Sequence, residues 1–421
     1  MYFFYQTIVT LLLVISPVII SYRIFKNKED KKRFKEKFSL SSVKRASGNL
    51  IWFHGASVGE IMSIVPLIKY YEKKRSINQI LITSSTLSSS KIIKTFKFKK
   101  TIHQFYPIDH TIITNKFLRY WKPSLAIFIE SEIWPSMIKN LKNRNIPTIL
   151  LNARFTKKTF NRWLKIKFFS KSIFDKISIA YPQNLETKLF LKKLKIKKIK
   201  FIGNLKFSEN PEKNLNKLNR KFKSKFKKRK LWIASSTHQD EEFFCALAHI
   251  KIKKKFKNLL TIIIPRHIHR AGEIIDKINN LNLKTVLHSS NLNNLNNVDI
   301  YLVDTFGETN KFYSIGCPVF LGKSIAKIGG QNPLEAARFG ARILHGPNTD
   351  NFKDVYKLLK TLNISKKIKT PEQLATSINF KKNKRAGKKI KNIGEKILKK
   401  TINELDYLIN NELKKTKFLG L

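Results

Sequence analysis

The chain has 421 residues, enough for two or three domains, and its 42% of hydrophobic residues excludes wholesale disorder. Two cysteines, Cys245 and Cys317, exclude a disulfide scaffold and are too few for a cysteine-based zinc site, which indicates a compartment where thiols stay reduced. The formal net charge of +56 favours an anionic partner, but the abundance of Lys, Asn and Ile also fits compositional drift on solvated faces, so charge alone selects no partner.

Residues 1–22 form an uncharged, mainly apolar segment as long as a membrane-spanning helix. No basic region precedes it and no small-residue cleavage site follows it, which disfavours a removed signal peptide. Ten Lys or Arg between Arg23 and Arg45 place this side of the segment in the cytoplasm by the positive-inside rule. We therefore expect a single N-terminal anchor helix, spanning the membrane or lying at its surface. A buried core helix or a cleaved leader is the alternative.

From residue 50 onward, short apolar runs alternate with amphipathic stretches, a pattern typical of a parallel sheet with helices on both faces. The first series of expected strands comprises 50–54, 80–83, 104–106, 125–129, 148–151, 177–180 and 199–202. The second series comprises 231–234, 259–264, 285–288, 300–303, 319–321 and 342–344. We thus predict an α/β fold of two Rossmann-like domains facing a cleft, with ligands outside the carboxyl ends of the strands.

The domain boundaries follow from the same pattern. We place the first domain at 23–207 and the second at 231–384, with a helical tail at 385–421. The segment 208–230 between the two series carries ten Lys or Arg from Lys213 to Lys230, which indicates a basic linker or an exposed basic helix.

Candidate catalytic groups follow the strands of the first half. Glu60 falls in the first turn of a helix and is either a general base or an ordinary acid at the positive end of the helix dipole. Glu130 and Glu132 follow another strand. If strand geometry persists, they share a face and raise each other's pKa. Arg154 and Lys206 could neutralise acidic substrate or developing negative charge.

Candidate anion-binding groups follow the strands of the second half. Arg266 comes directly after a hydrophobic strand, where a guanidinium can bind phosphate or carboxylate. The glycine-containing segments 304–308 and 329–335 each precede a predicted helix, whose free amides can hold phosphate. Glu335 could accept from ribose hydroxyls, or be an ordinary N-terminal helix acid. The run 55–59 matches the G-x-S-x-G pattern of hydrolases, but no His and acid partners are evident.

Taken together and in order, these motifs make the chain resemble the 3-deoxy-D-manno-octulosonic acid (Kdo) transferases of lipid A biosynthesis. The resemblance covers nearly the whole chain. It rests on SVGE at 57–60, ESEIWP at 130–135, LNAR at 151–154, GNLKF at 203–207, STH at 236–238, PRH at 265–267, DTFGE at 304–308, GGQNPLEAA at 329–337 and GPNTDNF at 346–352.

The resemblance implies an inverting, metal-independent glycosyltransferase of the GT-B type without a cofactor. Such an enzyme moves Kdo from CMP-Kdo to lipid IVA at the cytoplasmic face of the inner membrane. Its partners would be those two substrates and an anionic membrane surface, with no nucleic acid. The number of Kdo units added differs between family members and stays open.

Roles implied by the resemblance carry over residue by residue. Glu60 would be the proton acceptor, and Glu130 and Lys206 would stabilise the transition state. The CMP site would comprise Pro265, Arg266, Phe306, Gly307, Glu308, Asn332, Pro333, Leu334 and Glu335. The chain departs from the family pattern at Lys323, Gln331, Ser136 and 155–159, and the effect of these changes on finer donor and acceptor contacts stays open. The rival interpretations are a transferase with another nucleotide-sugar donor and a basic, non-catalytic protein that binds anionic membrane or RNA.

Overall fold

The computed structural model describes residues 1–209, 224, 226–227, 229–290, 295–325, 329–381 and 383–418. Most of the expected linker, residues 210–223, lies outside the described residues. The chain divides into two compact units, which are described separately. Unit 1 comprises Met1–Glu209 and Gly394–Leu421, and unit 2 comprises Asn210–Ile393.

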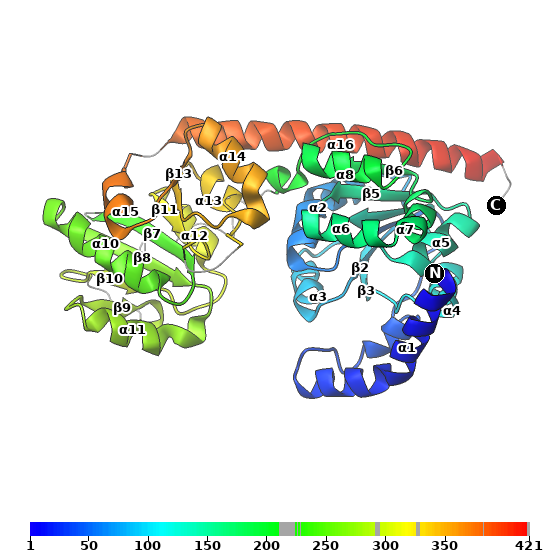
Figure 1. Cartoon of the computed structure of the whole chain (residues 1–421), viewed down its shortest axis with the longest axis horizontal. Coiled ribbons are helices and arrows are strands. Elements are labelled where there is room, and N and C mark those ends of the chain that lie inside the picture. The colour runs from blue at the N-terminus through cyan, green and yellow to red at the C-terminus, as the bar shows by residue number, and fades with distance from the viewer. Residues whose placement is uncertain are drawn as a thin grey trace. The chain divides into compact units, whose positions relative to one another are not determined.

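Unit 1 is built on a six-stranded parallel sheet in the order β3-β2-β1-β4-β5-β6. Its strands are β1 (Leu50–His54), β2 (Gln79–Ser84), β3 (Thr101–Phe105), β4 (Leu125–Ile129), β5 (Thr148–Ala153) and β6 (Ile179–Pro182). Every residue of β1, β2, β4 and β5 is buried, so both faces of the sheet centre are covered by helices (Figure 1). The strand order reverses between β1 and β4, and in such sheets the ligand site lies beside this reversal.

The helices of unit 1 alternate with its strands. They are α1 (Tyr2–Phe25), α2 (Val58–Tyr71), α3 (Leu87–Lys94), α4 (Thr111–Trp121), α5 (Pro135–Asn143), α6 (Lys157–Lys165), α7 (Lys167–Phe174) and α8 (Leu185–Lys193). Short 3₁₀ turns lie at Phe34–Phe38 and Leu205–Ser208. The expected strand at 199–202 is wrong: Ile199 makes only an isolated bridge to Ala180, and the following residues lead into the turn at Leu205.

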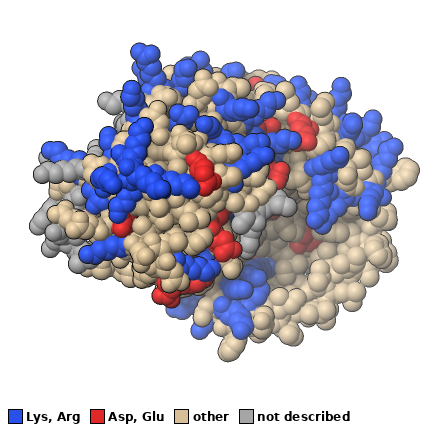
Figure 2. Space-filling view, turned by 60° about the vertical axis from the view of Figure 1, so that its left-hand side comes forward, with Lys and Arg blue, Asp and Glu red and all other residues tan. Residues whose placement is uncertain are grey.

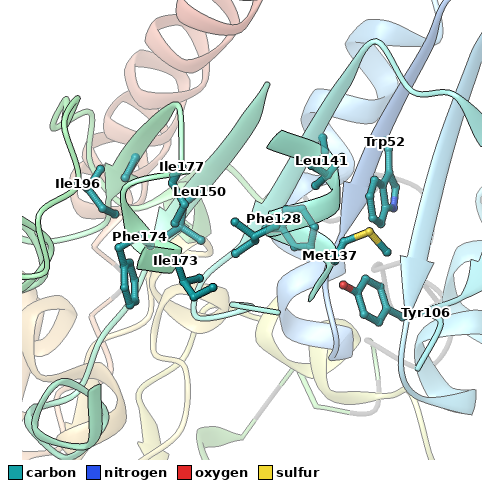
Figure 3. Packing of buried hydrophobic residues seen from close by; sticks show 14 of the residues in the cluster. Trp52, Tyr106, Phe128, Met137, Leu141, Leu150, Ile173, Phe174, Ile177 and Ile196 are labelled. Atoms are coloured by element: carbon teal, nitrogen blue, oxygen red, sulfur yellow. The ribbon is translucent and has the colours of Figure 1, made fainter. Parts of the chain in front are cut away.

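The core on one face of this sheet is rich in aromatic side chains. Figure 3 shows Met137 close to the rings of Trp52 and Tyr106, which are 6.2 Å apart. Trp52 also donates its indole N–H to Thr83 Oγ1 at 2.9 Å, so its one polar atom is satisfied inside the core. Burial of each such side chain contributes roughly 1.5–3 kcal/mol, which makes the ends of β1 and β4 a rigid support for the side chains that follow them.

Unit 2 holds a seven-stranded parallel sheet in the order β13-β12-β11-β7-β8-β10-β9. The strands are β7 (Lys230–Thr237), β8 (Leu259–Pro265), β9 (Thr285–Leu287), β10 (Ile300–Leu302), β11 (Val319–Leu321), β12 (Ile343–His345) and β13 (Ser365–Lys367). The helices are α10 (Glu241–Lys255), α11 (Ala271–Asn279), α12 (Thr309–Tyr313), α13 (Leu334–Arg338), α14 (Lys353–Thr361) and α15 (Pro371–Ser377). The sequence pattern missed β13, because a polar Ser-Lys-Lys run at a sheet edge carries no apolar signal.

The last helix, α16 (Lys384–Phe418), contributes to both units. From Gly394 onward it packs in unit 1, where a Cβ on Gly394 would lie 2.1 Å from the Phe207 carbonyl oxygen. Glu404 accepts a hydrogen bond from the Tyr181 hydroxyl at 3.1 Å. From Gly394 onward, the expected tail at 385–421 is therefore tied to unit 1 by a close backbone approach and by polar contacts.

Lys and Arg side chains are scattered over most of the face shown in Figure 2, and Asp and Glu are few. Such a distribution fits solvated lysines on many elements. It does not outline a single groove on this face.

Candidate functional site

Glu60 is held at the start of α2 by the turn that leaves β1. Ser57 is the N-cap of the helix and accepts a hydrogen bond from the Glu60 N–H. The Glu60 carboxylate folds back: Oε2 accepts from the Ala56 N–H at 2.7 Å, and Oε1 accepts from the Ser57 hydroxyl at 2.8 Å. Gly55 allows this close return, because a Cβ there would lie 3.1 Å from the Glu60 Cβ. The first-turn acid is therefore fixed in place by its own turn.

The surroundings of Glu60 favour its protonated form. Burial, the negative charge of Glu132 and the smaller effect of Glu130 raise the pKa of Glu60 to about 7, against the lowering effect of its bonds to Ser57 and Ala56. A carboxyl with this pKa is half ionised near neutral pH, so it can take a proton from a hydroxyl and release it again. The geometry and the pKa together suit a general base.

Glu130 and Lys206 form an ion pair between Glu130 Oε1 and Lys206 Nζ. Glu130 follows the last residue of β4 with a left-handed φ of 59°. Strand geometry therefore does not persist to Glu132, and the expected shared face of the two carboxylates is wrong.

Two asparagines hold the turn that carries Lys206. Asn152, at the end of β5, accepts from the Leu205 N–H at 3.0 Å, and Asn204 accepts from the Lys206 N–H at 2.9 Å. No specific role for Asn152 is evident from the sequence. Its left-handed φ of 52° next to a strand end is what aims its side chain at the turn. The Asn152 and Asn204 side chains thus hold the backbone of the turn from which Lys206 reaches Glu130.

Glu132 turns away from Glu130 toward the end of β1. Its Oε2 lies 3.2 Å from His54 Nε2 and accepts from the Trp134 indole N–H at 3.0 Å. His54 is buried and stacks on Tyr106 with ring centroids 3.8 Å apart. No function of His54 or Trp134 was predicted from the sequence. A histidine as the last residue of an otherwise apolar strand was the available signal.

The remaining candidates of unit 1 have simpler surroundings. The Arg154 backbone N–H lies 3.4 Å from the Glu130 carbonyl, so Arg154 belongs to the same edge of the sheet. Ser57 bonds to Glu60, and no histidine hydrogen-bonds to it in the described part of the chain. The G-x-S-x-G run therefore serves as a helix cap and does not form a hydrolase triad with the described residues.

A second set of candidates meets at the carboxyl edge of the unit 2 sheet. Arg266 directly follows β8, is exposed, and donates its backbone N–H to Thr237 at 3.0 Å. Glu335 lies at the start of α13. Burial raises its pKa, while the positive charges of Arg338 and Arg266 act in the opposite direction, so Arg266 lies within electrostatic range of it.

The other candidates at this edge range from buried to exposed. Asn332 accepts from the Leu334 N–H at 3.1 Å and so orders the start of α13, where Pro333 and Leu334 are buried. Phe306 is exposed. Gly307 has a positive φ of 86°, a backbone conformation that residues with a side chain adopt only at an energetic cost. Glu308 is paired with Lys311 at 2.7 Å.

A buried carboxylate orders the loop next to this edge. Glu241, the first residue of α10, accepts backbone N–H groups from His238 at 3.0 Å, Lys323 at 2.6 Å, Ser324 at 2.9 Å and Ile325 at 2.9 Å. Sequence reasoning missed Glu241, because an acid in a first helical turn looks ordinary. The described residues contain no group of three or more His, Cys, Asp or Glu placed to hold a metal ion.

Comparison with known proteins adds the family context. Residues 32–209 match the family model described as 3-deoxy-D-manno-octulosonic-acid transferase (kdotransferase). The 3-deoxy-D-manno-octulosonic acid transferase of Rickettsia bellii is 34% identical over 393 residues, 92% of this chain and 93% of that protein. The enzyme of the same name from Haemophilus influenzae is 28% identical over 366 residues, 85% of this chain and 84% of that protein.

Solved structures show the same fold at low sequence identity. A glycosyltransferase from Rickettsia africae aligns with a TM-score of 0.54 at 10% identity, over 88% of this chain and all of that one. A putative UDP-N-acetylglucosamine 2-epimerase from Listeria monocytogenes aligns with a TM-score of 0.56 at 10% identity, over 84% of this chain and 91% of that one. The expected α/β fold with two parallel sheets, of the GT-B type, is confirmed.

Proposed function

The chain belongs to the 3-deoxy-D-manno-octulosonic acid transferase family, and from that premise we propose that it moves Kdo from CMP-Kdo to lipid IVA with inversion and without a metal ion or cofactor. This transfer reaction would take place at the cytoplasmic face of the inner membrane. The observation that carries the proposal is the Glu60 carboxyl, fixed at the sheet edge with a pKa of about 7. A sugar hydroxyl is a poor nucleophile until such a base takes its proton.

The other residues of unit 1 fit a supporting role. Glu60 takes the proton of the acceptor hydroxyl while the oxygen of that hydroxyl attacks the anomeric carbon of Kdo. The ammonium of Lys206, held by Glu130, is a fixed positive charge at the same sheet edge. A preorganised charge of this kind stabilises negative charge that develops in the transition state, because it needs no rearrangement at the moment of reaction.

The unit 2 edge fits the donor. The bond from the anomeric carbon to the CMP phosphate oxygen breaks, and the negative charge stays on the phosphate. The exposed guanidinium of Arg266 offers two parallel N–H donors to such a group. Glu335 can accept hydrogen bonds from the ribose hydroxyls, and Phe306, Gly307 and Asn332 provide shape and backbone contacts around the nucleotide.

Incubating the protein with lipid IVA and a CMP-Kdo supply, followed by mass spectrometry of the lipid, tests the whole proposal. We expect lipid IVA to gain Kdo, and UDP-sugars to give no product. Glu60→Gln should lower turnover by at least about 100-fold, the range lost with a general base. Glu186→Gln is the matched control, because Glu186 is an exposed first-turn acid of α8. Transfer from a UDP-sugar, or normal turnover of Glu60→Gln, would contradict the proposal.

A further inference from the structure

One narrow face of α1 is covered by the rest of the protein. Val9, Ser16 and Ile20 are buried, and their spacing of seven and four residues puts them on a single face of the helix. The covered stripe runs along the middle of α1, from Val9 to Ile20. Among the helices of the described chain, α1 is the one apolar and long enough to cross a membrane, with a mean hydropathy of 2.2.

The first two turns of α1 are fixed to the body of unit 1 by polar side chains. The Tyr5 hydroxyl donates to Asp109 Oδ2 at 2.7 Å, and the Gln6 amide donates to Ser136 Oγ at 2.7 Å. The Gln6 carbonyl in turn accepts from the Thr111 hydroxyl at 2.7 Å. Figure 1 shows this end of α1 beside α4 and α5; Thr111 and Ser136 belong to these helices, and Asp109 lies just before α4.

These contacts rest on parts of unit 1 that are themselves firmly built. Asp109 is buried and accepts the N–H groups of Ser136 and Met137 at 2.9 Å each, so it caps the start of α5. The Lys139 ammonium lies over the Tyr2 ring, with Nζ 3.8 Å from the ring centroid. The docking of α1 thus continues the packing of α4 and α5.

A spanning α1 could not keep these contacts. With a rise of about 1.5 Å per residue, Tyr5 lies about 27 Å from Arg23 along the helix, close to the thickness of a bilayer's hydrocarbon core. If the basic side of α1 stayed in the cytoplasm, Tyr5 and Gln6 would be on the far side of the membrane. Asp109 and Ser136 belong to the folded body and could not follow them.

The uncovered surface of α1 has the chemistry of a membrane contact. Its large exposed apolar side chains are Phe3, Phe4, Ile8, Leu11, Leu12, Val14, Ile15, Val18, Ile19, Tyr22 and Phe25. Basic side chains follow directly, and we name five of these lysines the basic collar: Lys26, Lys28, Lys31, Lys32 and Lys35. An apolar helix face beside a cluster of cations is typical of helices that lie in an anionic membrane surface.

We infer that α1 lies in the plane of an anionic membrane, docked on unit 1 along one face, with its exposed apolar side chains inserted and the basic collar against the headgroups. The inference goes beyond the proposed reaction, since its tests measure no transfer. It resolves the two orientations that the sequence left open in favour of the surface-bound one.

A cysteine pair tests the docking in native membranes. Gln6→Cys with Ser136→Cys should be cross-linked by a short bis-maleimide, which spans the extra length of the Gln6 side chain, because the wild-type side chains are in hydrogen-bond contact. Val14→Cys with Ser136→Cys is the matched control and should not be cross-linked, since Val14 is on the exposed face. Cys245 and Cys317 are buried and can stay in place.

A topology measurement keeps the test valid if the paired variants fold poorly. A cysteine added before Met1 in the wild-type protein should react with a membrane-impermeant maleimide only when the cytoplasmic side is exposed. Labelling from the outside of intact spheroplasts would show a spanning helix and overturn the inference. A well-folded Gln6→Cys, Ser136→Cys variant that fails to cross-link would overturn it as well.

Binding to vesicles tests the partner. The protein should sediment with vesicles that contain phosphatidylglycerol far more than with phosphatidylcholine alone, and Leu11→Lys with Val18→Lys should weaken this binding at least tenfold. The matched control is Leu185→Lys with Leu189→Lys on α8, where the side chains are 63% and 61% exposed, against 59% and 71% for Leu11 and Val18. If the α1 variant binds vesicles normally but loses self-association, the face binds a second copy of the chain and the inference is wrong.

Discussion

Lys206 forms its ion pair with Glu130 at a place where neither charge is well solvated. The two side chains are 13% and 10% exposed, and they come from a 3₁₀ turn and from the end of β4. Each of these charges loses hydration free energy on burial, and the attraction between them compensates for that loss. If one charge is removed, the other stays buried without this compensation.

Removing one partner should therefore destabilise unit 1. We expect Lys206→Met to lower the free energy of unfolding by about 3–5 kcal/mol, the usual cost of an uncompensated buried charge. Lys206→Met with Glu130→Gln should recover much of that loss, since no charge remains. Urea unfolding of the three proteins measures the difference. Equal stability of the single and double variants would mean that Glu130 is solvated after all.

Activity should rise with pH through about 7, because only the ionised form of Glu60 can accept a proton. Replacing the neighbouring charge with Glu132→Gln should move the midpoint of the profile to lower pH, since Glu132 raises the pKa of Glu60. The amide that this substitution introduces can still meet His54 and Trp134. The pH dependence of kcat/KM measures both midpoints, and an unshifted midpoint in the variant would place the titrating group elsewhere.

The same pKa has a consequence for stability. Folding raises the pKa of Glu60 from 4.5 to about 7, so the folded state binds the proton more tightly than the unfolded one. The favourable contribution is complete below pH 4.5 and is lost as the pH rises through 7. Glu60→Gln removes this loss, so the variant should melt higher than the wild type at pH ~8 and close to it at pH ~4.5. Thermal melts over this pH range measure the effect, and a constant difference would contradict it.

Much of the fold was predictable, because buried parallel strands consist of consecutive apolar residues. β1, β4 and β8 are wholly buried and stood out for that reason. The segment 199–202 is also mainly apolar, apart from Lys200, yet forms only one bridge, since pairing depends on the neighbouring strand β6, which ends at Pro182. The local sequence pattern of a segment does not indicate where its neighbouring strand ends.

The site was predictable in part. Glu60 could be placed in the first turn of its helix, because Ser57 and Gly55 mark the turn before it. The left-handed backbone of Glu130, and with it the divergence of Glu130 from Glu132, could not, because no glycine or asparagine signals it. Lys206 was one lysine among many, and only the turn held by Asn152 sets it apart.

Glu241 gives a last prediction, in unit 2. Its buried carboxylate accepts four backbone N–H groups, three of them from the loop at Lys323, and a Cβ on Gly322 would lie 2.6 Å from Glu241 Oε2. Glu241→Gln replaces one acceptor oxygen with an NH₂ group that faces N–H donors, so we expect a loss of about 1–3 kcal/mol in stability.

Because the loop that Glu241 orders adjoins the proposed nucleotide edge, Glu241→Gln should also weaken CMP binding. Gly322→Ala should do the same, since the added methyl group would push against Glu241 and the neighbouring backbone at Ser236. Glu273→Gln is the matched control, because Glu273 is an exposed first-turn acid of α11 in the same unit. Calorimetric titration with CMP measures the affinity, and normal affinity in a destabilised Glu241→Gln protein would limit Glu241 to a structural role.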